Sequence, residues 1–596
     1  MSNGRSNGIG ARVAAAFFDN PHLIGVVLVA IGVASAWAWL GIPRLEDPRI
    51  TNRNPIIITE VPGATAERVD ALVTERIEIA LQELPEIKNL SSTSRAGVSV
   101  IAVELEDAVQ RGQNETIFAK IRDRVERVSS EFPPEAAPPL VDDLRGAVAF
   151  TLTIGVRSAD GHGHSVGILK RIGEDLATRL RTIEGTEIVR LYGEPREQIT
   201  VLLDRSKSVA RGVTAAMIAG QLAQADADGA AGSARGEVGD LPVEVLGELS
   251  TIERIGLVPL ASTADGATFR LADIALIERG ELDPANQKAY VDGHAAVLVA
   301  ARITDATQIE RWRRDAEFIL NEVSSVLGDD IELDVIFDQS VYTEERLLEL
   351  GTNLALGAGL VTLIIAVVMG WRAAIVVGIA LPLVSGLVLI ATFGEGGAVH
   401  QMSIFGMIIA LGLLVDNAIV VTDEIAARLA RGMERREAVV RSIDHLFLPL
   451  LASTATTVLA FAPIALLPGN AGDFVGSIGK SVILAIGASF VLSMTVIAAL
   501  AGRLVRLRRS DQRRSWLADG VASERVSRLL HRLIRAGLRV PIGMAVLAAT
   551  PCVIGVAVSG SLGKEFFPPI DRNMFDLRVW LPTGTSIDHT DRKSVV

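Results

Sequence analysis

Seven separate stretches of apolar residues constrain the fold of this chain more than any other feature of its sequence. A transmembrane α-helix needs about 20 consecutive, mostly apolar residues to cross the hydrocarbon core of a bilayer. Stretches of this kind cover residues 22–41, 348–370, 373–393, 403–422, 446–467, 478–501 and 540–560. The sequence therefore predicts a polytopic α-helical protein with about seven transmembrane helices.

The first stretch, residues 22–41, has the features of a permanent anchor. A short tail, residues 1–21, precedes it. The stretch continues through Trp37 and Trp39 and lacks the small-residue cleavage site of a secretory signal peptide. We therefore expect this segment to stay in the protein as its first transmembrane helix.

Basic residues occur in alternate connections between the stretches, which predicts how the chain is oriented. Short connections on the cytoplasmic side carry an excess of Lys and Arg. Three connections carry such residues: Arg372 in the first, Arg428, Arg431, Arg435, Arg436 and Arg441 in the second, and Arg503, Arg506, Arg508, Arg509, Arg513 and Arg514 in the third. We expect these connections and the N-terminal tail in the cytoplasm, and residues 42–347 and 561–596 on the outer side.

The composition indicates a large water-exposed part in addition to the spans. The chain is 49% hydrophobic and 21% charged, which is more charge than a bundle of spans alone would carry. The single cysteine, Cys552, lies in the seventh apolar stretch, so an outer domain at 42–347 must be stabilised by its own core without disulfides. A formal net charge of −12 argues against nucleic acid as a partner.

Residues 42–347 alternate between strand-like and helix-like patterns. The first round is a β-branched strand at 55–61, an amphipathic helix at 66–84 and a second strand at 98–106. Thr65 directly precedes the helix and is expected to cap it.

Two further rounds follow the same order of strand, helix and strand. They are predicted at 150–156, 166–183 and 188–193, and at 296–303, 307–325 and 331–337. This order is typical of an α+β domain with split βαβ units. Residues 226–280 between the rounds are Gly-rich and poor in helix signals, and we expect β-hairpins there.

The entry to the outer domain occurs twice in the chain. Gly41 follows the first span and is 21 positions before Pro62, whereas Gly563 follows the seventh span and is 19 positions before Pro582. A strand is predicted in both copies, at 55–61 and at 574–581. Internal repeats are a mark of transporters, with the binding pathway at the repeat interface. We expect a second outer domain to begin at 561–596 without being completed, after a basic, amphipathic cytoplasmic linker at 502–539.

Asp416 is a carboxyl group within the apolar stretch 403–422. A bare charge at this depth costs at least about 2.5 kcal/mol, so such residues are usually functional. Asp416 and Asp423 are seven positions apart, almost two helical turns, and should share one face; Asn417 and Glu424 form a second such pair beside them. We interpret Asp416 as a site that takes up and releases a proton, and Asp423 and Glu424 mainly as solvated residues at the cytoplasmic end.

Several other kinds of site are not supported by the sequence. The chain has no P-loop of the GxxxxGK[ST] type, so ATP is not expected to drive it, and no arrangement of thiol or imidazole groups indicates an enzyme. His162 and His164 lie in a Gly-rich loop without further ligands nearby, which favours a solvated hairpin loop over a metal site. Met217 is the single methionine of residues 42–347, whereas soft copper or silver ions prefer Met or Cys ligands.

The motif Gly412-Leu-Leu-Val-Asp-Asn-Ala-Ile-Val-Val421 resembles the fourth-span signature of resistance–nodulation–division (RND) efflux transporters. Gly563-Lys-Glu-Phe-Phe-Pro568, Leu271-Ala-Asp-Ile-Ala-Leu-Ile-Glu-Arg-Gly280 and Pro62-Gly-Ala also resemble segments of that family, and the resemblance covers essentially the whole chain. It implies a homotrimeric drug/proton antiporter of the bacterial inner membrane, with protons in place of a cofactor. The resemblance further implies that residues 42–347 form a porter-like and docking-like periplasmic domain, with docking-like hairpins at 226–280. It also implies a periplasmic adaptor, an outer-membrane channel and small amphiphilic substrates, as in the hydrophobe/amphiphile branch.

The resemblance assigns roles to individual residues. Asp416 matches the first of two adjacent aspartates that carry protons in many members, and Asn417 stands where the second would be. Asp423 is a weaker candidate for the proton relay. Phe150 and Tyr192 fall where drug exporters place aromatic residues of the substrate pocket, although both are equally consistent with ordinary core positions.

Two alternatives remain open at this point. The chain could be a truncated product that inserts into the membrane without transport activity. The same fold could also export metal ions or an endogenous lipid.

Overall fold

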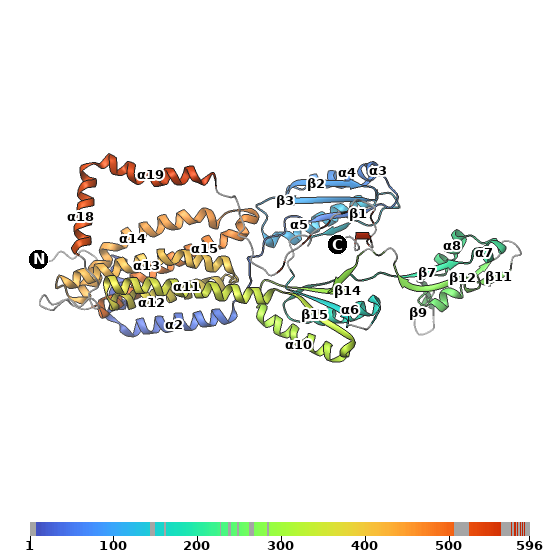
Figure 1. Ribbon diagram of the computed structural model, residues 1–596, viewed down its shortest axis with the longest axis horizontal. Helices are drawn as coiled ribbons and strands as arrows, with labels where there is room; N and C mark the ends of the chain where they lie inside the picture. Colours follow the sequence, from blue (N-terminus) through green and yellow to red (C-terminus); the bar gives the residue numbers. More distant parts are fainter. Residues whose placement is uncertain are drawn as a thin grey trace. The chain divides into compact units, whose positions relative to one another are not determined.

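The computed structural model describes most of the chain as regular helices and strands (Figure 1). The described residues are 8–143, 150–159, 163–226, 228–235, 240–246, 249–261, 267–282, 285, 287–505 and 524–561, with a few single residues between 574 and 590. They form two compact units. The first contains residues 1–151, 302–314 and 338–575, and the second contains 152–301, 315–337 and 576–596.

The described part of the chain has seven helices that are long and apolar enough to cross a membrane. They are α2 (Pro21–Gly41), α11 (Gln339–Met369), α12 (Trp371–Gly394), α13 (Gln401–Ala430), α14 (Arg435–Ala465), a continuous helix over Gly469–Leu504, and α19 (Pro541–Ser559). The Gly469–Leu504 helix consists of α15 (Gly469–Leu492), a π-helical turn (Ser493–Ile497) and α16 (Ala498–Leu504). Together with the sheets described below, they confirm the predicted fold class, a polytopic membrane protein with a soluble α+β part.

Helix α13 lies at the centre of the helical bundle, beside α12 and α15 (Figure 1). Its buried face includes Ala410, Ala418 and Val421, which are fully buried. Glycine allows the close contact with α15, because a Cβ atom on Gly406 would lie only 2.8 Å from the carbonyl oxygen of Ile478. Small residues at such contacts let helix backbones approach each other in membranes, where the hydrophobic effect does not drive association.

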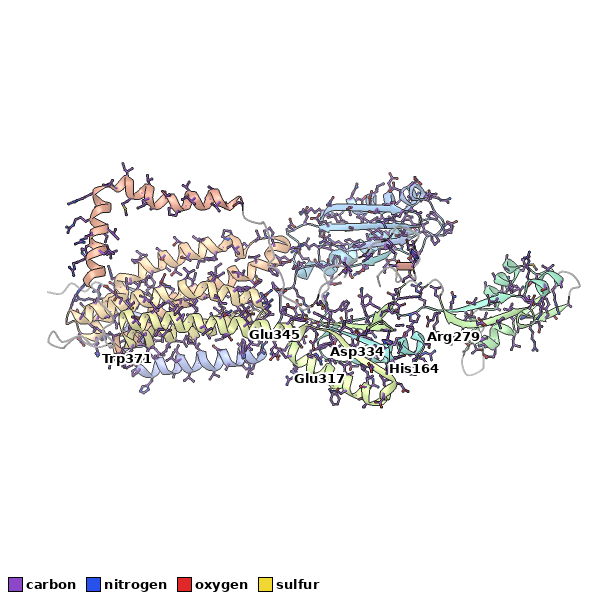
Figure 2. All side chains as sticks on the ribbon, viewed as in Figure 1. His164, Arg279, Glu317, Asp334, Glu345 and Trp371 are labelled. Carbon is purple, nitrogen blue, oxygen red and sulfur yellow. The ribbon has the colours of Figure 1, made fainter. Side chains whose placement is uncertain are left out.

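Two shorter helices of the first unit directly precede helices that are long and apolar enough to span a membrane. Helix α1 (Ile9–Asp19) packs against α14 and α16, and an ion pair of 2.9 Å joins Asp19 to Arg436. Helix α18 (Glu524–Arg539) directly precedes α19 and falls within the predicted amphipathic linker. Figure 2 marks Trp371, with which α12 begins.

The soluble part of the first unit contains an antiparallel sheet in the order β2-β3-β1-β4. The strands are β1 (Ile56–Glu60), β2 (Ile87–Arg95), β3 (Val98–Leu105) and β4 (Leu140–Asp142). A helical segment over Ala66–Gln82 (α3, a π-helical turn and α4) and helix α5 (Asn114–Ser129) bury their apolar faces in one core with β1 and β3. Thr65 caps α3 as predicted, since its hydroxyl accepts a hydrogen bond from the Arg68 N–H at 3.4 Å.

The second unit contains a five-stranded sheet. Its strands are β5 (Leu152–Ser158), β6 (Thr186–Tyr192), β13 (Ala289–Val291), β14 (His294–Ile303) and β15 (Ile331–Asp338), and β14 pairs with both β5 and β6. Helices α6 (Val166–Arg181) and α10 (Ile309–Leu327) are joined by an ion pair of 3.0 Å between Arg179 and Glu322. All three predicted rounds of strand, helix and strand are thus present among the described residues.

The prediction for residues 226–280 was only partly right. The hairpin β8–β9 (Asp228–Arg235 and Asp240–Leu246) and the pair β10–β11 (Pro259–Ala261 and Thr268–Arg270) are present, but β12 (Ala275–Glu281) pairs with the distant β7 (Glu197–Leu203). The short helix α9 (Ile252–Gly256), capped by Thr251, was missed, as were α7 (Arg205–Ala210) and α8 (Ala215–Ala225).

The strand predicted at 574–581 is not formed by the residues of this segment that the structure describes. Met574, Leu577, Val579 and Leu581 are outside any strand. The repeated Gly563 and Pro582 lie outside the described residues.

Candidate functional site

Asp416 lies in the middle of α13, on a face that the other described residues leave exposed. Ile409, Gly412, Asp416, Val420 and Asp423 are all exposed, and their spacing of three or four residues places them along one side of the helix. Hence the predicted common face of Asp416 and Asp423 is present. Within the described residues, the Asp416 side chain has no hydrogen bond or ion pair.

Asn417 points in a different direction from its neighbour. Its side chain is 7% exposed and lies within the buried face of α13. The amide is not ionisable, so this helix presents one titratable side chain at this depth. The adjacent positions 416 and 417 are therefore not equivalent: the first faces away from the bundle and the second faces into it.

Glu424 is held by an ion pair at the end of α13. Its Oε1 atom accepts a hydrogen bond of 2.8 Å from Arg428 Nε, and Arg428 Nη2 lies 2.7 Å from the same oxygen. The ring of His445, on α14, lies 3.6 Å from the same oxygen. The Glu424 carboxylate thus takes part in a structural ion pair, whereas the preceding residue, Asp423, is exposed.

Direct contacts hold the helix segment that carries Asp416. The Ser489 hydroxyl of α15 donates a hydrogen bond of 2.6 Å to the carbonyl oxygen of Leu414. That carbonyl is two residues before Asp416, so α15 fixes the position of this turn. The Gly406 contact described above fixes α13 two turns further toward its start.

The beginning of α13 is attached to the segment that follows α2. The Leu45 N–H donates to the Val399 oxygen at 3.0 Å, and the Val399 N–H donates to the Pro43 oxygen at 2.9 Å. The Gln401 N–H donates to the Glu46 oxygen at 3.1 Å, and its side chain bonds Asp47. The first residue of α13 therefore moves together with residues 43–47.

A second attachment joins the start of α15 to the soluble part of the first unit. The buried Arg53 guanidinium contacts Asp473 Oδ2 and Asn470 Oδ1, each at 2.8 Å, and donates to the carbonyl oxygen of Val109. The Thr51 N–H also donates to Asp473 Oδ2, at 2.9 Å. We call this cluster the Arg53 joint. The sequence pattern gave no indication of it.

His400 caps α13 and is buried beside the first attachment. Its Nδ1 atom accepts a hydrogen bond from the Ser403 N–H at 3.4 Å. Burial lowers the pKa of His400 to about 4, because the charged imidazolium is poorly solvated there. A proton on Nδ1 would also remove the acceptor that the cap needs.

We expect the stability of the chain to fall as the pH decreases from about 6.5 to about 4, because of His400. The unfolded imidazole takes up its proton near pH 6.5, whereas the folded one does so only near pH 4. His400 therefore makes its full contribution to the free energy of unfolding above pH 6.5, and up to about 3 kcal/mol of that free energy is lost by pH 4. Asparagine caps helices without titrating, so His400→Asn should flatten the pH dependence of the thermal unfolding midpoint.

The exposed His22 supplies the matched control for this experiment. His22→Asn should leave the pH profile of the wild type in place. An unchanged profile in His400→Asn would show that other groups cause the loss of stability in acid.

The two aromatic candidates belong to different compact units. Phe150 is half-buried in the first unit and precedes β5, which begins at Leu152 rather than at the predicted position 150. Tyr192 ends β6 in the second unit and is 37% exposed. Neither residue is a fully buried core residue.

The histidine loop provides no metal centre in the described structure. His164 lies just before α6 (Figure 2), and His162 lies outside the described residues. In the described part of the chain, no group of three or more His, Cys, Asp or Glu residues could hold a metal ion.

The apolar helices, the soluble sheets and the isolated carboxyl of α13 define a polytopic membrane protein with an ionisable residue inside a span. The chain belongs to the AcrB/AcrD/AcrF family of RND permeases, whose family model matches residues 13–595. The predicted family is thus confirmed.

The chain is similar in sequence to an uncharacterized transporter and to two metal-resistance proteins. The chain is 22% identical over 553 residues to an uncharacterized transporter of Haemophilus influenzae, covering 91% of this chain and 52% of the relative. It is 24% identical over 621 residues to the nickel-cobalt-cadmium resistance protein NccA of Alcaligenes xylosoxydans xylosoxydans (95% and 55%). It is 23% identical over 597 residues to the cation efflux system protein CzcA of Alcaligenes sp. (strain CT14) (95% and 54%). The chain spans about half the length of these relatives.

Proposed function

We propose that this chain belongs to a transporter that exports hydrophobic or amphiphilic compounds in exchange for protons. The observation that carries the proposal is the Asp416 carboxyl, in the middle of an apolar helix and facing away from the bundle. Ionisable residues at this depth mark proton or substrate pathways. Membership of the RND family supports the same interpretation.

Protonation of Asp416 is the coupling step in this proposal. The charged carboxylate needs water or a polar partner, whereas the neutral acid is tolerated against an apolar surface. Each change of state therefore alters what the exposed face of α13 can pack against. Asp423 lies on the same face toward the helix end, where it is exposed, while the Asn417 amide is buried and cannot ionise.

The attachments at the starts of α13 and α15 carry this change to the soluble part of the first unit. Movement of α13 acts directly on residues 43–47, which are bonded to Val399 and Gln401. Movement of α15 acts on residues 51–53 through the Arg53 joint. Chains of hydrogen bonds and packed helices are the kind of connection through which one part of a protein acts on another.

Phe150 and Tyr192 are the proposed aromatic contacts for substrate. Their partial exposure leaves ring surface available to an apolar or amphiphilic molecule. The working assembly in this proposal is a homotrimer in the bacterial inner membrane, with residues 42–347 in the periplasm. A periplasmic adaptor and an outer-membrane channel complete the export path.

A second candidate function is the export of divalent metal cations. The names of two relatives, the NccA protein and the CzcA protein, favour it. Against it, the described part of the chain has no group of three or more His, Cys, Asp or Glu residues that could hold such a cation.

Export assays in cells that lack other efflux pumps distinguish the two candidates. Cells that express the transporter should accumulate less of a lipophilic cationic dye, and a protonophore should abolish the difference. Their tolerance of nickel, cobalt and cadmium should remain unchanged. Protection against these metals without any effect on dye accumulation would establish the second candidate, and failure in both assays would reject transport of either class.

A further inference from the structure

A recess in the second unit, with a volume of about 460 Å³, is lined by charged side chains. Helix α6 contributes three of them, the start of β7 and the residue before it contribute two, and the end of β12 contributes one. They are Lys170, Arg171, Glu174, Arg196, Glu197 and Arg279, the last of which is labelled in Figure 2. Four of these side chains are cations and two are carboxylates, so the recess has an excess of positive charge although the net charge of the chain is −12.

One carboxylate of the recess, that of Glu197, is shared between two guanidinium groups. Its Oε2 atom accepts hydrogen bonds from Arg279, at 2.9 Å from Nε and also from Nη2, and Arg171 Nη2 lies 3.8 Å from the other oxygen. The pKa of the Glu197 carboxyl is lowered, chiefly by the hydrogen bonds from Arg279, and the charges of Arg171 and Lys170 act in the same direction. Three cations therefore act on one carboxylate at this place.

The other cations of the recess have hydrogen-bond donors that the protein does not use. Among the described residues, the Arg196 side chain has no hydrogen bond or ion pair, and the 3.8 Å contact of Arg171 is too long for a hydrogen bond. Lys170 donates a hydrogen bond to the Pro195 oxygen at 3.3 Å and lies 3.7 Å from Glu194. An anion that enters the recess would therefore meet free N–H groups from more than one side chain.

We propose that this recess binds a phosphate monoester group. The planar guanidinium group matches two phosphate oxygens at once and forms charge-assisted hydrogen bonds with them. A monoester carries close to two negative charges at neutral pH, which balances the excess of four cations over two carboxylates. The volume of about 460 Å³ also leaves room for the organic part of the ester, since small-molecule sites usually measure about 300–1,000 Å³. The site is separate from Asp416, and the proposal does not depend on the exported compound.

Equilibrium dialysis of radiolabelled glycerol 3-phosphate against the detergent-solubilised full chain tests this proposal at constant ionic strength. Binding should saturate, and inorganic phosphate should displace the label whereas glycerol should not. A soluble compound and a lipid headgroup can both supply a phosphate monoester, and dioctanoyl phosphatidic acid carries this group on a lipid. Displacement by this lipid at a concentration at least about tenfold lower than that of unlabelled glycerol 3-phosphate would identify a lipid as the source. Similar concentrations of the two would identify a soluble ester.

Variants of the lining residues test whether the recess is the binding site. Arg171→Gln combined with Arg196→Gln should weaken binding at least about tenfold, because the two changes remove the guanidinium groups whose donors are free. Glu197→Gln should strengthen binding at least about threefold, because it removes a competing negative charge and releases Arg279. Arg205→Gln changes an exposed arginine of α7 outside the recess, and this matched control should bind like the wild type. The thermal unfolding midpoint of each variant checks its folding.

Three results would overturn the proposal. The first is the absence of saturable binding by the wild type. The second is equal binding by the wild type and the double arginine variant, because the ester would then bind at another place. The third is weaker binding by Glu197→Gln, because a recess that attracts the ester by its positive charge cannot lose affinity when a negative charge is removed.

Discussion

Replacement of Asp416 by asparagine should abolish proton-driven export while the protein remains folded and inserted. The amide occupies nearly the same volume but does not ionise, so the exposed face of α13 would keep one charge state throughout the cycle. A residue that must change its protonation state for coupling cannot be replaced by one that does not ionise. The rate of dye efflux should therefore fall at least about tenfold, which corresponds to an increase of about 1.4 kcal/mol or more in the activation free energy.

Efflux of a preloaded dye after a pH jump provides the measurement, with membrane abundance and the thermal midpoint as checks of folding. The structure predicts a normal midpoint because, among the described residues, the Asp416 side chain has no hydrogen bond or ion pair to lose. Asp423→Asn is the matched control, since it makes the same chemical change on the same face, toward the end of the helix. It should retain most of the efflux. Wild-type efflux by the Asp416 variant would falsify the coupling role.

Asp416 is the titratable residue that α13 presents at this depth, which supports its assignment as the coupling residue. Asn417 is buried and Glu424 is held by Arg428, so neither can replace the Asp416 carboxyl in a proton pathway. Asp416 itself faces away from the part of the bundle that the structure describes. A partner for its charge must come from outside these helices, because a lone carboxylate facing lipid would be costly.

The spans and the common face of Asp416 and Asp423 could be predicted because simple periodicities determine them. Bilayer thickness sets the length of an apolar run, and 3.6 residues per turn places positions 416 and 423 on one side. The cap at Thr65 follows from a similarly local rule. Each of these inferences uses residues that are close together in the sequence.

The features that the sequence did not reveal depend on contacts between distant residues. Arg53 and Asp473 are 420 positions apart, and nothing in either local sequence indicates the other. The pairing of β12 with β7 across residues 204–274 is of the same kind. Local patterns predict what a segment can form, whereas these contacts depend on where the whole chain brings the segments together.

The Arg53 joint allows a second strong prediction, namely that Arg53→Met destabilises the first unit by about 3 kcal/mol. The Arg53 side chain is 5% exposed, and its guanidinium satisfies Asp473, Asn470 and the Val109 carbonyl at once. Methionine fills a similar volume but leaves the partly buried Asp473 carboxylate without its cation. Removing one partner of such a pair costs more than the pair contributes, because the other charge stays in place.

Arg76→Met is the matched control for this loss. Arg76 also forms a short ion pair, with Glu131 at 2.6 Å, but its side chain is 38% exposed and that of Glu131 is 63% exposed. Water can replace the lost partner at such a site, so the change should cost less than about 1 kcal/mol. Thermal unfolding in detergent and limited proteolysis of residues 51–109 would report both variants. Arg53→Lys should fall between them, because an ammonium group keeps the charge but cannot reach all the acceptors of the planar guanidinium. Equal losses of unfolding free energy in Arg53→Met and Arg76→Met would mean that burial does not determine the strength of the Arg53 joint. The connection between α15 and the soluble sheet would then be made by other contacts.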